Sequence, residues 1–129
     1  MNPVVHFELP YLNAGRARKF YESAFGWKTD HLGEFGGNYI LVTTAESDVR
    51  PGFPAGAING GLFPVKPEWP AQYPSIVIGV NDIDEAILRI SQSGGEVLGE
   101  PMEIPNFGIY VSFLDTEGNR SSIIQAIGA

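Results

Sequence analysis

Two stretches of the chain share one pattern, an apolar strand followed by a short amphipathic helix that stops at glycine. In the first copy, residues 3–9 alternate with a period of two, which predicts a strand with one apolar face and places His6 and Glu8 together on the other face. Residues 13–27 then carry apolar side chains at helical spacing. Asn13 is a suitable N-cap and Gly26 a suitable C-terminal stop.

The second copy repeats this order. Residues 75–80 are an apolar run, and the helical pattern of residues 81–95 follows, with Asn81 or Asp82 as its cap and Gly94-Gly95 as its end. Each helix precedes three more runs typical of strands. These are residues 27–32, 39–44 and 57–65 in the first copy, and residues 96–103, 107–114 and 120–127 in the second. The sequence therefore predicts one βαβββ unit written twice.

The connections suggest how the two copies are organised. A length of 129 residues is typical of one domain, so we expect a single α+β domain made of two modules, about residues 3–65 and 74–128. The proline-rich residues 64–74 are the expected linker, and residues 46–56 an expected loop. Inside the run 57–65, a pair of glycines marks a place where another group approaches the backbone closely.

Composition removes several classes of function. The chain has no cysteine, which excludes disulfides, thiolate nucleophiles and cysteine-built zinc sites. Its net charge of -7 disfavours nucleic acid as a partner, because the one tight basic group, Arg16, Arg18 and Lys19, is too small for a phosphate-binding surface. No apolar run has the length of a signal peptide or a membrane span. We therefore expect a soluble, cytoplasmic protein without membrane partners.

Taken together, these features resemble the vicinal oxygen chelate superfamily, which contains glyoxalase I, the bleomycin-resistance proteins and the extradiol dioxygenases. The resemblance spans about residues 4–125 and is carried by His6, Phe20-Tyr21, Phe25-Gly26-Trp27, residues 80–84, Gly94-Gly95 and residues 115–119. It implies that each module forms a curved mixed sheet with its helix outside. It also implies that two such sheets, from one chain or from a homodimer, enclose a cleft for a small molecule.

Metal-using members of that family place ligands on the first and last strands of each module. By the spacing of the shared motifs, His6 matches the first of these positions. The other positions fall on Ser75, Ser122 and residues 59–61, none of which is a useful ligand. One imidazole does not make a transition-metal site, which needs about three converging donors. The resemblance therefore implies an incomplete metal site, and we expect neither a bound metal nor another cofactor.

The sequence leaves three roles open for His6. It can be a hydrogen-bonded remnant or part of a pocket wall, a general acid or base, or a group that orients a ligand. Glu8 either raises the basicity of His6 or is solvated at the strand end, and both residues are catalytic candidates. His31 is expected on the surface of an edge strand. The candidate ligand-binding residues on the cleft face are Tyr39, Asn59, Ser75, Val77, Tyr110, Ser122 and Ile124.

Three functions follow from these patterns. The leading hypothesis is a protein that binds a small organic ligand without a complete metal site and works as a homodimer, because the cleft wall is apolar with a few hydroxyls and an amide. The alternative is a lyase or isomerase similar to glyoxalase I, with His6 and Glu8 transferring a proton. A protein-interaction module, based on the proline-rich linker, ranks third. The sequence leaves open whether the protein is an enzyme.

Overall fold

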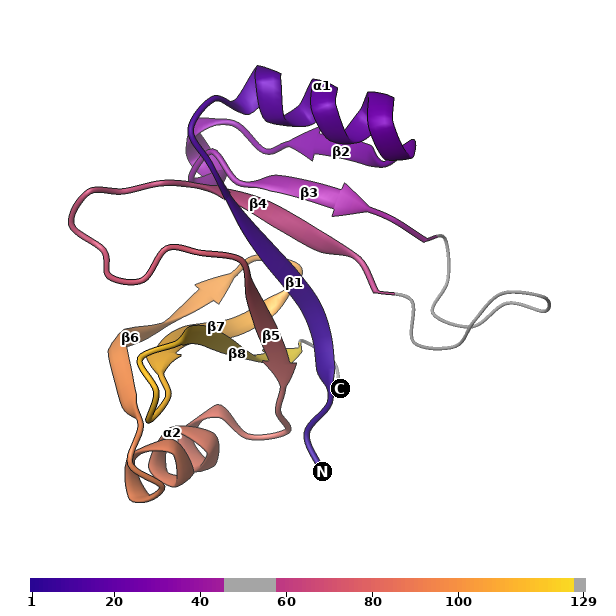
Figure 1. The fold of residues 1–129 in the computed structure, drawn as a ribbon. Helices are drawn as coiled ribbons and strands as arrows, with labels where there is room; N and C mark the ends of the chain where they lie inside the picture. The colour runs from indigo at the N-terminus through magenta and orange to yellow at the C-terminus, as the bar shows by residue number, and fades with distance from the viewer. Residues whose placement is uncertain (46–57, 127–129) are drawn as a thin grey trace. The chain divides into compact units, whose positions relative to one another are not determined.

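The computed structural model describes residues 1–45 and 58–126. The chain divides into two compact units, which we call the N-terminal module (residues 6–69) and the C-terminal module (residues 1–5 and 70–129). Figure 1 labels the elements of both. The loop expected at residues 46–56 lies outside the described residues.

The N-terminal module follows the order βαβββ, with one 3₁₀ turn between its second and third strands. Its elements are β1 (Val4–Tyr11), which starts in the C-terminal module, α1 (Ala14–Phe25), β2 (Lys28–His31), the 3₁₀ turn (Glu34–Gly36), β3 (Ile40–Thr43) and β4 (Gly60–Pro64). The strand order is β2-β3-β4-β1. β1 and β4 are parallel, and the other pairs are antiparallel.

The C-terminal module repeats this arrangement. Its elements are β5 (Ser75–Gly79), α2 (Ile83–Gln92), β6 (Glu96–Ile104), β7 (Gly108–Leu114) and β8 (Arg120–Ala126). The strand order is β5-β8-β7-β6, and β5 and β8 form the parallel pair. Each module is thus a mixed sheet with one helix, and the α+β class of two βαβββ modules expected from the sequence is confirmed.

The helix α1 starts and stops where the sequence indicates. The side chain of Asn13 accepts a hydrogen bond from the backbone N–H of Arg16, and Gly26 ends the helix in the left-handed conformation, at φ 70°. Figure 1 shows α1 running alongside β2, which it contacts. Its inward residues, Ala17 and Tyr21 among them, pack against the buried core residues Ile40, Val42 and Leu62.

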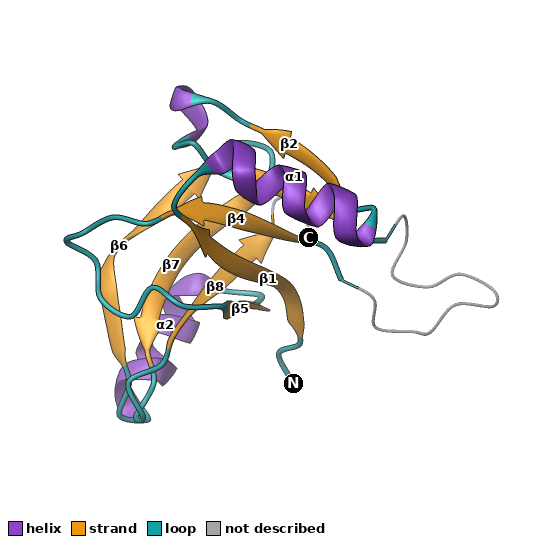
Figure 2. Ribbon diagram, turned by 45° about the horizontal axis from the view of Figure 1, so that its top comes forward, coloured by secondary structure: helices purple, strands orange, loops and turns teal. Residues whose placement is uncertain are grey.

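The helix α2 covers one face of its own sheet, where it contacts β6, β7 and β8 (Figure 2). Of the two caps that the sequence allowed, Asp82 is the one used, and its Oδ1 accepts the N–H of Glu85 at 3.1 Å. Ile83 is buried with Val111 and Ile123 in the core beneath the helix. In the described parts of the chain, no helix is long and apolar enough to span a bilayer.

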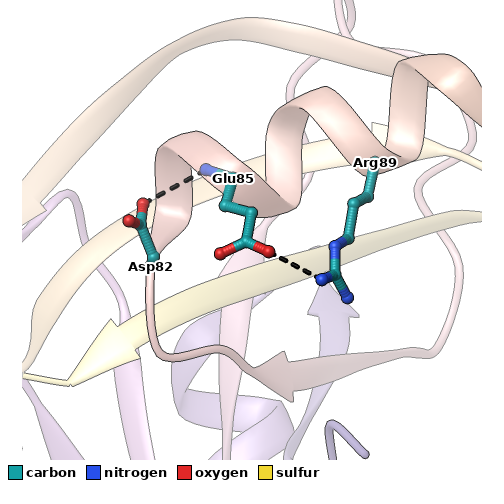
Figure 3. A network of polar contacts seen from close by, with 3 residues as sticks. All are labelled: Asp82, Glu85 and Arg89. Atoms are coloured by element: carbon teal, nitrogen blue, oxygen red, sulfur yellow. Dashed lines mark hydrogen bonds and ion pairs between the residues drawn. The ribbon is translucent and has the colours of Figure 1, made fainter.

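Two polar contacts on α2 differ in their expected contribution to stability (Figure 3). Asp82→Ala removes the helix cap and is expected to lower the free energy of unfolding by about 1 kcal/mol. Arg89→Ala removes an exposed ion pair with Glu85 at 2.6 Å and is expected to cost about 0.3–0.5 kcal/mol. Urea unfolding of both variants measures the difference. An equal or larger loss for Arg89→Ala would contradict this ranking.

Alternation along β1 decides what each face of the N-terminal sheet carries. Phe7 and Leu9 turn toward α1 and pack on the core. His6 and Glu8, being one residue out of step, lie on the face opposite α1. The separation of an apolar and a polar face that the sequence predicted is therefore present, and it places the acid–base groups away from the helix.

Candidate functional site

The central polar cluster of the N-terminal module joins His6, Tyr39 and Glu8. The hydroxyl of Tyr39 donates to Oε2 of Glu8 at 2.8 Å and lies 3.1 Å from Nε2 of His6. Tyr39 precedes β3 and reaches across the sheet to β1, so residues more than thirty positions apart in the sequence meet in one hydrogen-bonded chain. The two catalytic candidates, His6 and Glu8, are thereby connected to the ligand-binding candidate Tyr39. We call these three residues the His6–Tyr39–Glu8 cluster.

Two glycines of β4 make room for this cluster and for the core. A Cβ at Gly61 would lie 1.9 Å from the hydroxyl oxygen of Tyr39, so the phenol ring rests directly on the strand backbone. A Cβ at Gly60 would lie 2.6 Å from atoms of the Phe7 ring on the other face. The close approach that the sequence indicated at these glycines is therefore confirmed, and the approaching groups are two aromatic rings of the chain itself.

The surroundings of His6 and Glu8 correct one expectation. Glu8 is only 7% exposed and accepts the Tyr39 hydroxyl, so the interpretation of a solvated carboxylate at the strand end was wrong. His6 is half-buried, and burial lowers the pKa of its imidazole from the ordinary value. The imidazole is thus neutral at physiological pH, the form in which it can accept a proton.

The lowered pKa predicts a pH dependence of stability. Unfolded His6 binds a proton near its ordinary pKa, whereas folded His6 resists protonation. The contribution of His6 is therefore fully present above the unfolded pKa and is lost as pH falls toward the folded pKa. Between about pH 7.5 and about pH 5.5, the wild-type protein should lose more free energy of unfolding than His6→Gln. Denaturant titrations at several pH values test this, and parallel curves for the two proteins would contradict it.

A second polar cluster belongs to the C-terminal module. The hydroxyls of Tyr110 and Ser122 are 2.6 Å apart, and those of Ser122 and Ser112 are 3.0 Å apart. Arg120 donates from Nη2 to Ser112 at 3.3 Å. Ser112 and Ser122 are 6% and 2% exposed. Three hydroxyls and a guanidinium therefore form a continuous chain across β7 and β8, which we call the hydroxyl chain.

Strand register shows which other candidates share the face of the hydroxyl chain. Val77 pairs with Ser122, and Ile124 pairs with both Gly79 and Tyr110. Ser75 is two residues before Val77 on β5 and so has the same orientation. The face opposite α2 therefore brings together five sequence candidates: Ser75, Val77, Tyr110, Ser122 and Ile124.

Sequence reasoning missed two members of this cluster, Ser112 and Arg120. Each stands two positions from a residue that was named, Tyr110 and Ser122 respectively. The period of two that defines a strand face was the signal that could have found them. These omissions matter because Arg120 adds the only charge in the hydroxyl chain.

Asn59 and His31 differ from the other candidates. The side-chain oxygen of Asn59 accepts the backbone N–H groups of Thr44 and Ala45 at 2.8 and 3.0 Å, which favours a role in holding the end of β3. His31 lies on the edge strand β2 as expected, but its Nε2 is buried and has no hydrogen-bond partner among the described residues. The expectation of a plain surface histidine was therefore incomplete.

A shallow depression on α1 is a weaker candidate for a functional site than these two polar clusters. It is an open surface that contains neither a carboxylate nor an imidazole. Its lining residues are Arg16, Lys19, Phe20, Ser23 and Ala24. The imidazole of His6 and the carboxylate of Glu8 lie instead on the sheet face opposite the helix.

The donors of the chain do not fit a divalent transition metal. Within the part of the chain that the structure describes, no three His, Cys, Asp or Glu side chains come together. Nε2 of His6 faces the Tyr39 hydroxyl, and the hydroxyl of Ser122 is engaged by Tyr110 and Ser112. A neutral serine is a poor ligand compared with the imidazoles and carboxylates that such ions prefer. We therefore derive no chemical step through a metal.

Duplicated βαβββ modules, each with a polar cluster on the sheet face opposite its helix, define an α+β class of protein. The sequence model of the Glyoxalase/Bleomycin resistance protein/Dioxygenase superfamily matches residues 4–123, and this chain belongs to that superfamily. The resemblance seen in the sequence is thus confirmed.

Individual relatives agree with this assignment. A glyoxylase-like domain-containing protein from Didymella fabae is 29% identical over 124 residues, which are 94% of this chain and 91% of that protein. A methylmalonyl-CoA epimerase from Streptomyces coelicolor, solved with 2-nitronate-propionyl-CoA, is similar with a TM-score of 0.71 and 18% identity over 97% of each chain. A hypothetical protein from Bacillus halodurans C-125 gives a TM-score of 0.69 at 16% identity, covering 99% of this chain and 96% of that one. These structures share the fold.

Proposed function

We propose that this protein binds a small organic molecule at the sheet face opposite α1, with the His6–Tyr39–Glu8 cluster making the polar contacts. The observation that carries the proposal is the hydrogen-bonded chain from a half-buried imidazole through a phenol to a buried carboxylate. Buried polar groups are costly to keep in a fold unless they are satisfied. A cluster of three on one face therefore favours a functional role over a purely structural one.

The ligand chemistry follows from the groups present. An imidazole and a carboxylate recognise hydrogen-bond donors and cationic groups, and the net charge of -7 also favours a neutral or cationic molecule over a polyanion. By strand register Leu41 and Phe63 lie on the same side of the sheet as Glu8, and such apolar and aromatic neighbours suit a partly aromatic compound. The protein is proposed to act as a homodimer, as the family resemblance implies, and in the cytoplasm, as its lack of cysteine led us to expect.

The binding proposal is tested with a defined panel of drugs, antibiotics and glutathione thioethers by thermal shift and calorimetry. We expect at least one compound to bind, and His6→Ala to weaken it about tenfold, which corresponds to losing one good hydrogen bond. Arg89→Ala, on the exposed side of α2, is the matched control and should bind as the wild type does. Absence of binding across the panel, or full binding by His6→Ala, would overturn the proposal.

A second candidate function is proton transfer on a carbon next to a carbonyl, in a lyase or isomerase. The favouring observation is the neutral imidazole, whose pKa is lowered by burial, held by a tyrosine that is itself bonded to a carboxylate. Several structural neighbours are epimerases of methylmalonyl-CoA, one of them solved with that compound. In this function the proton moves from the carbon to His6, which leaves an enolate, and returns after exchange with solvent.

Deuterium uptake separates this candidate from simple binding. The protein is incubated in D₂O with methylmalonyl-CoA and, separately, with the hemithioacetal of methylglyoxal and glutathione. Incorporation of deuterium that falls by about a hundredfold or more in His6→Ala supports proton transfer.

Metal analysis of the purified protein is expected to find less than about a tenth of an equivalent of nickel, zinc or iron. A stoichiometric metal that is lost in His6→Ala would instead support a metal enzyme.

A further inference from the structure

The hydrogen bonds of the Tyr39 hydroxyl determine which nitrogen of His6 carries a hydrogen. Tyr39 has one hydroxyl hydrogen to donate, and the structure directs it to Oε2 of Glu8 at 2.8 Å. Glu8 is 7% exposed, and a carboxylate removed from water needs hydrogen-bond donors. The Tyr39 oxygen is therefore an acceptor toward its other close neighbour, Nε2 of His6 at 3.1 Å.

An accepting oxygen at this distance requires a hydrogen on Nε2. A neutral imidazole carries one hydrogen, so its lone pair is then on Nδ1. Among the described residues, the only buried side-chain nitrogen or oxygen without a partner is Nε2 of His31. Nδ1 of His6 has no hydrogen-bond partner in the described parts of the chain, and because it is not a buried atom of this kind, it retains some exposed surface through which a ligand can reach it.

The backbone holds this arrangement in place. The Tyr39 ring lies against Gly61, where a Cβ would come within 1.9 Å of the hydroxyl oxygen. Gly61 pairs in register with Glu8 of β1 and with Leu41 of β3. The phenol of Tyr39 thus crosses β4, which lies between β3 and β1, to reach His6 and Glu8 on β1, and its position follows from the strand pairing of this module.

From these contacts we infer that Tyr39 is a positioning residue, which with Glu8 fixes the tautomer of His6 and directs the Nδ1 lone pair toward the ligand. This inference rests on the proposed function and narrows its ligand class. The ligand presents an O–H or N–H group to Nδ1 or, in the proton-transfer function, an acidic C–H beside a carbonyl. In the latter case Nδ1 receives the proton, the imidazole becomes cationic, and the carbonyl oxygen takes the negative charge of the enolate.

Nitrogen-15 NMR of the whole protein tests the tautomer directly. The spectrum is expected to show His6 protonated at Nε2 and unprotonated at Nδ1 near neutral pH. Protonation at Nδ1 would mean that Tyr39 donates to His6 and that Glu8 holds the hydrogen, and it would overturn the inference. In Tyr39→Phe, the exchange of the Nε2 hydrogen with solvent should accelerate roughly five- to tenfold, because its acceptor is gone.

Tyr21→Phe is the matched control, since Tyr21 packs on the opposite face of the same sheet. It should leave the His6 spectrum and the exchange rate unchanged.

Alkylation with iodoacetamide gives a second measurement on the wild-type protein. The product at His6 should carry the label on Nδ1, and a label on Nε2 would contradict the inference. If Tyr39→Phe does not fold, the NMR spectrum and the alkylation of the wild-type protein still test the inferred tautomer of His6.

The outcomes distinguish the two proposals. A His6 protonated at Nε2 in a protein that binds nothing in the panel supports the tautomer and overturns the binding function. Binding by a protein whose His6 is protonated at Nδ1 supports the function and overturns the role assigned to Tyr39. A structural role of Tyr39 alone would lower the stability of Tyr39→Phe without changing hydrogen exchange at His6 beyond the Tyr21→Phe control.

Discussion

Replacing Gly60 with alanine is expected to lower the free energy of unfolding by about 1–3 kcal/mol, because the new methyl group meets an aromatic ring inside the core. The added Cβ would lie 2.6 Å from three atoms of Phe7. Phe7 packs against the buried core of its module and has the Trp27 ring 5.6 Å away, so it has little room to move. Denaturant unfolding measures the loss.

The same substitution at the next residue is expected to act on the functional cluster. In Gly61→Ala the methyl group meets the far end of the Tyr39 side chain, which is half-buried and can turn away. Turning away breaks the hydrogen bonds to His6 and Glu8. The Nε2 hydrogen of His6 should therefore exchange faster in Gly61→Ala and remain protected in Gly60→Ala. The same exchange rate in both variants would contradict the assignment of the two glycines to opposite faces.

Periodicity was enough to predict the α-helices and most of the strand positions in the described part of this chain. The apolar alternation of residues 3–9, the helix cap at Asn13 and the stop at Gly26 are all local signals, and each was found where expected. The runs of residues 27–32 and 39–44 that were expected as strands appear as β2 and β3, which pair in antiparallel register. These features are decided by residues close in sequence, which explains why the sequence alone indicated them.

Contacts between distant strands were harder to predict. The sequence placed His6, Glu8 and Tyr39 on one side of a sheet, but their hydrogen bonds depend on β4 lying between β3 and β1, with a glycine under the Tyr39 ring. Glu8 was expected to be solvated because a carboxylate at a strand end usually is. Glu8 is buried beside Tyr39, which donates a hydrogen bond to it, and no local sequence pattern around Glu8 predicts that contact.

Ser122→Ala is expected to lower the free energy of unfolding by about 1–3 kcal/mol, because it removes a buried hydroxyl that makes two hydrogen bonds. The hydroxyl of Ser122 joins Tyr110 at 2.6 Å to Ser112 at 3.0 Å, and Ser122 is only 2% exposed. Ser121→Ala is the matched control on the same strand but on the other face, and it should change stability by no more than about 0.5 kcal/mol.

A double-mutant cycle separates the hydroxyl chain from simple burial. If Ser112 and Ser122 act together, Ser112→Ala and Ser122→Ala should deviate from additivity by at least about 0.5 kcal/mol, because removing either one already breaks the chain. Strict additivity would mean that each serine is satisfied independently of the other. Because Arg120 donates to Ser112, the loss at Ser122 also leaves the guanidinium end of the chain separated from Tyr110. Coupling in this cycle would therefore indicate that Ser112 and Ser122 stabilise the sheet as one hydrogen-bonded unit.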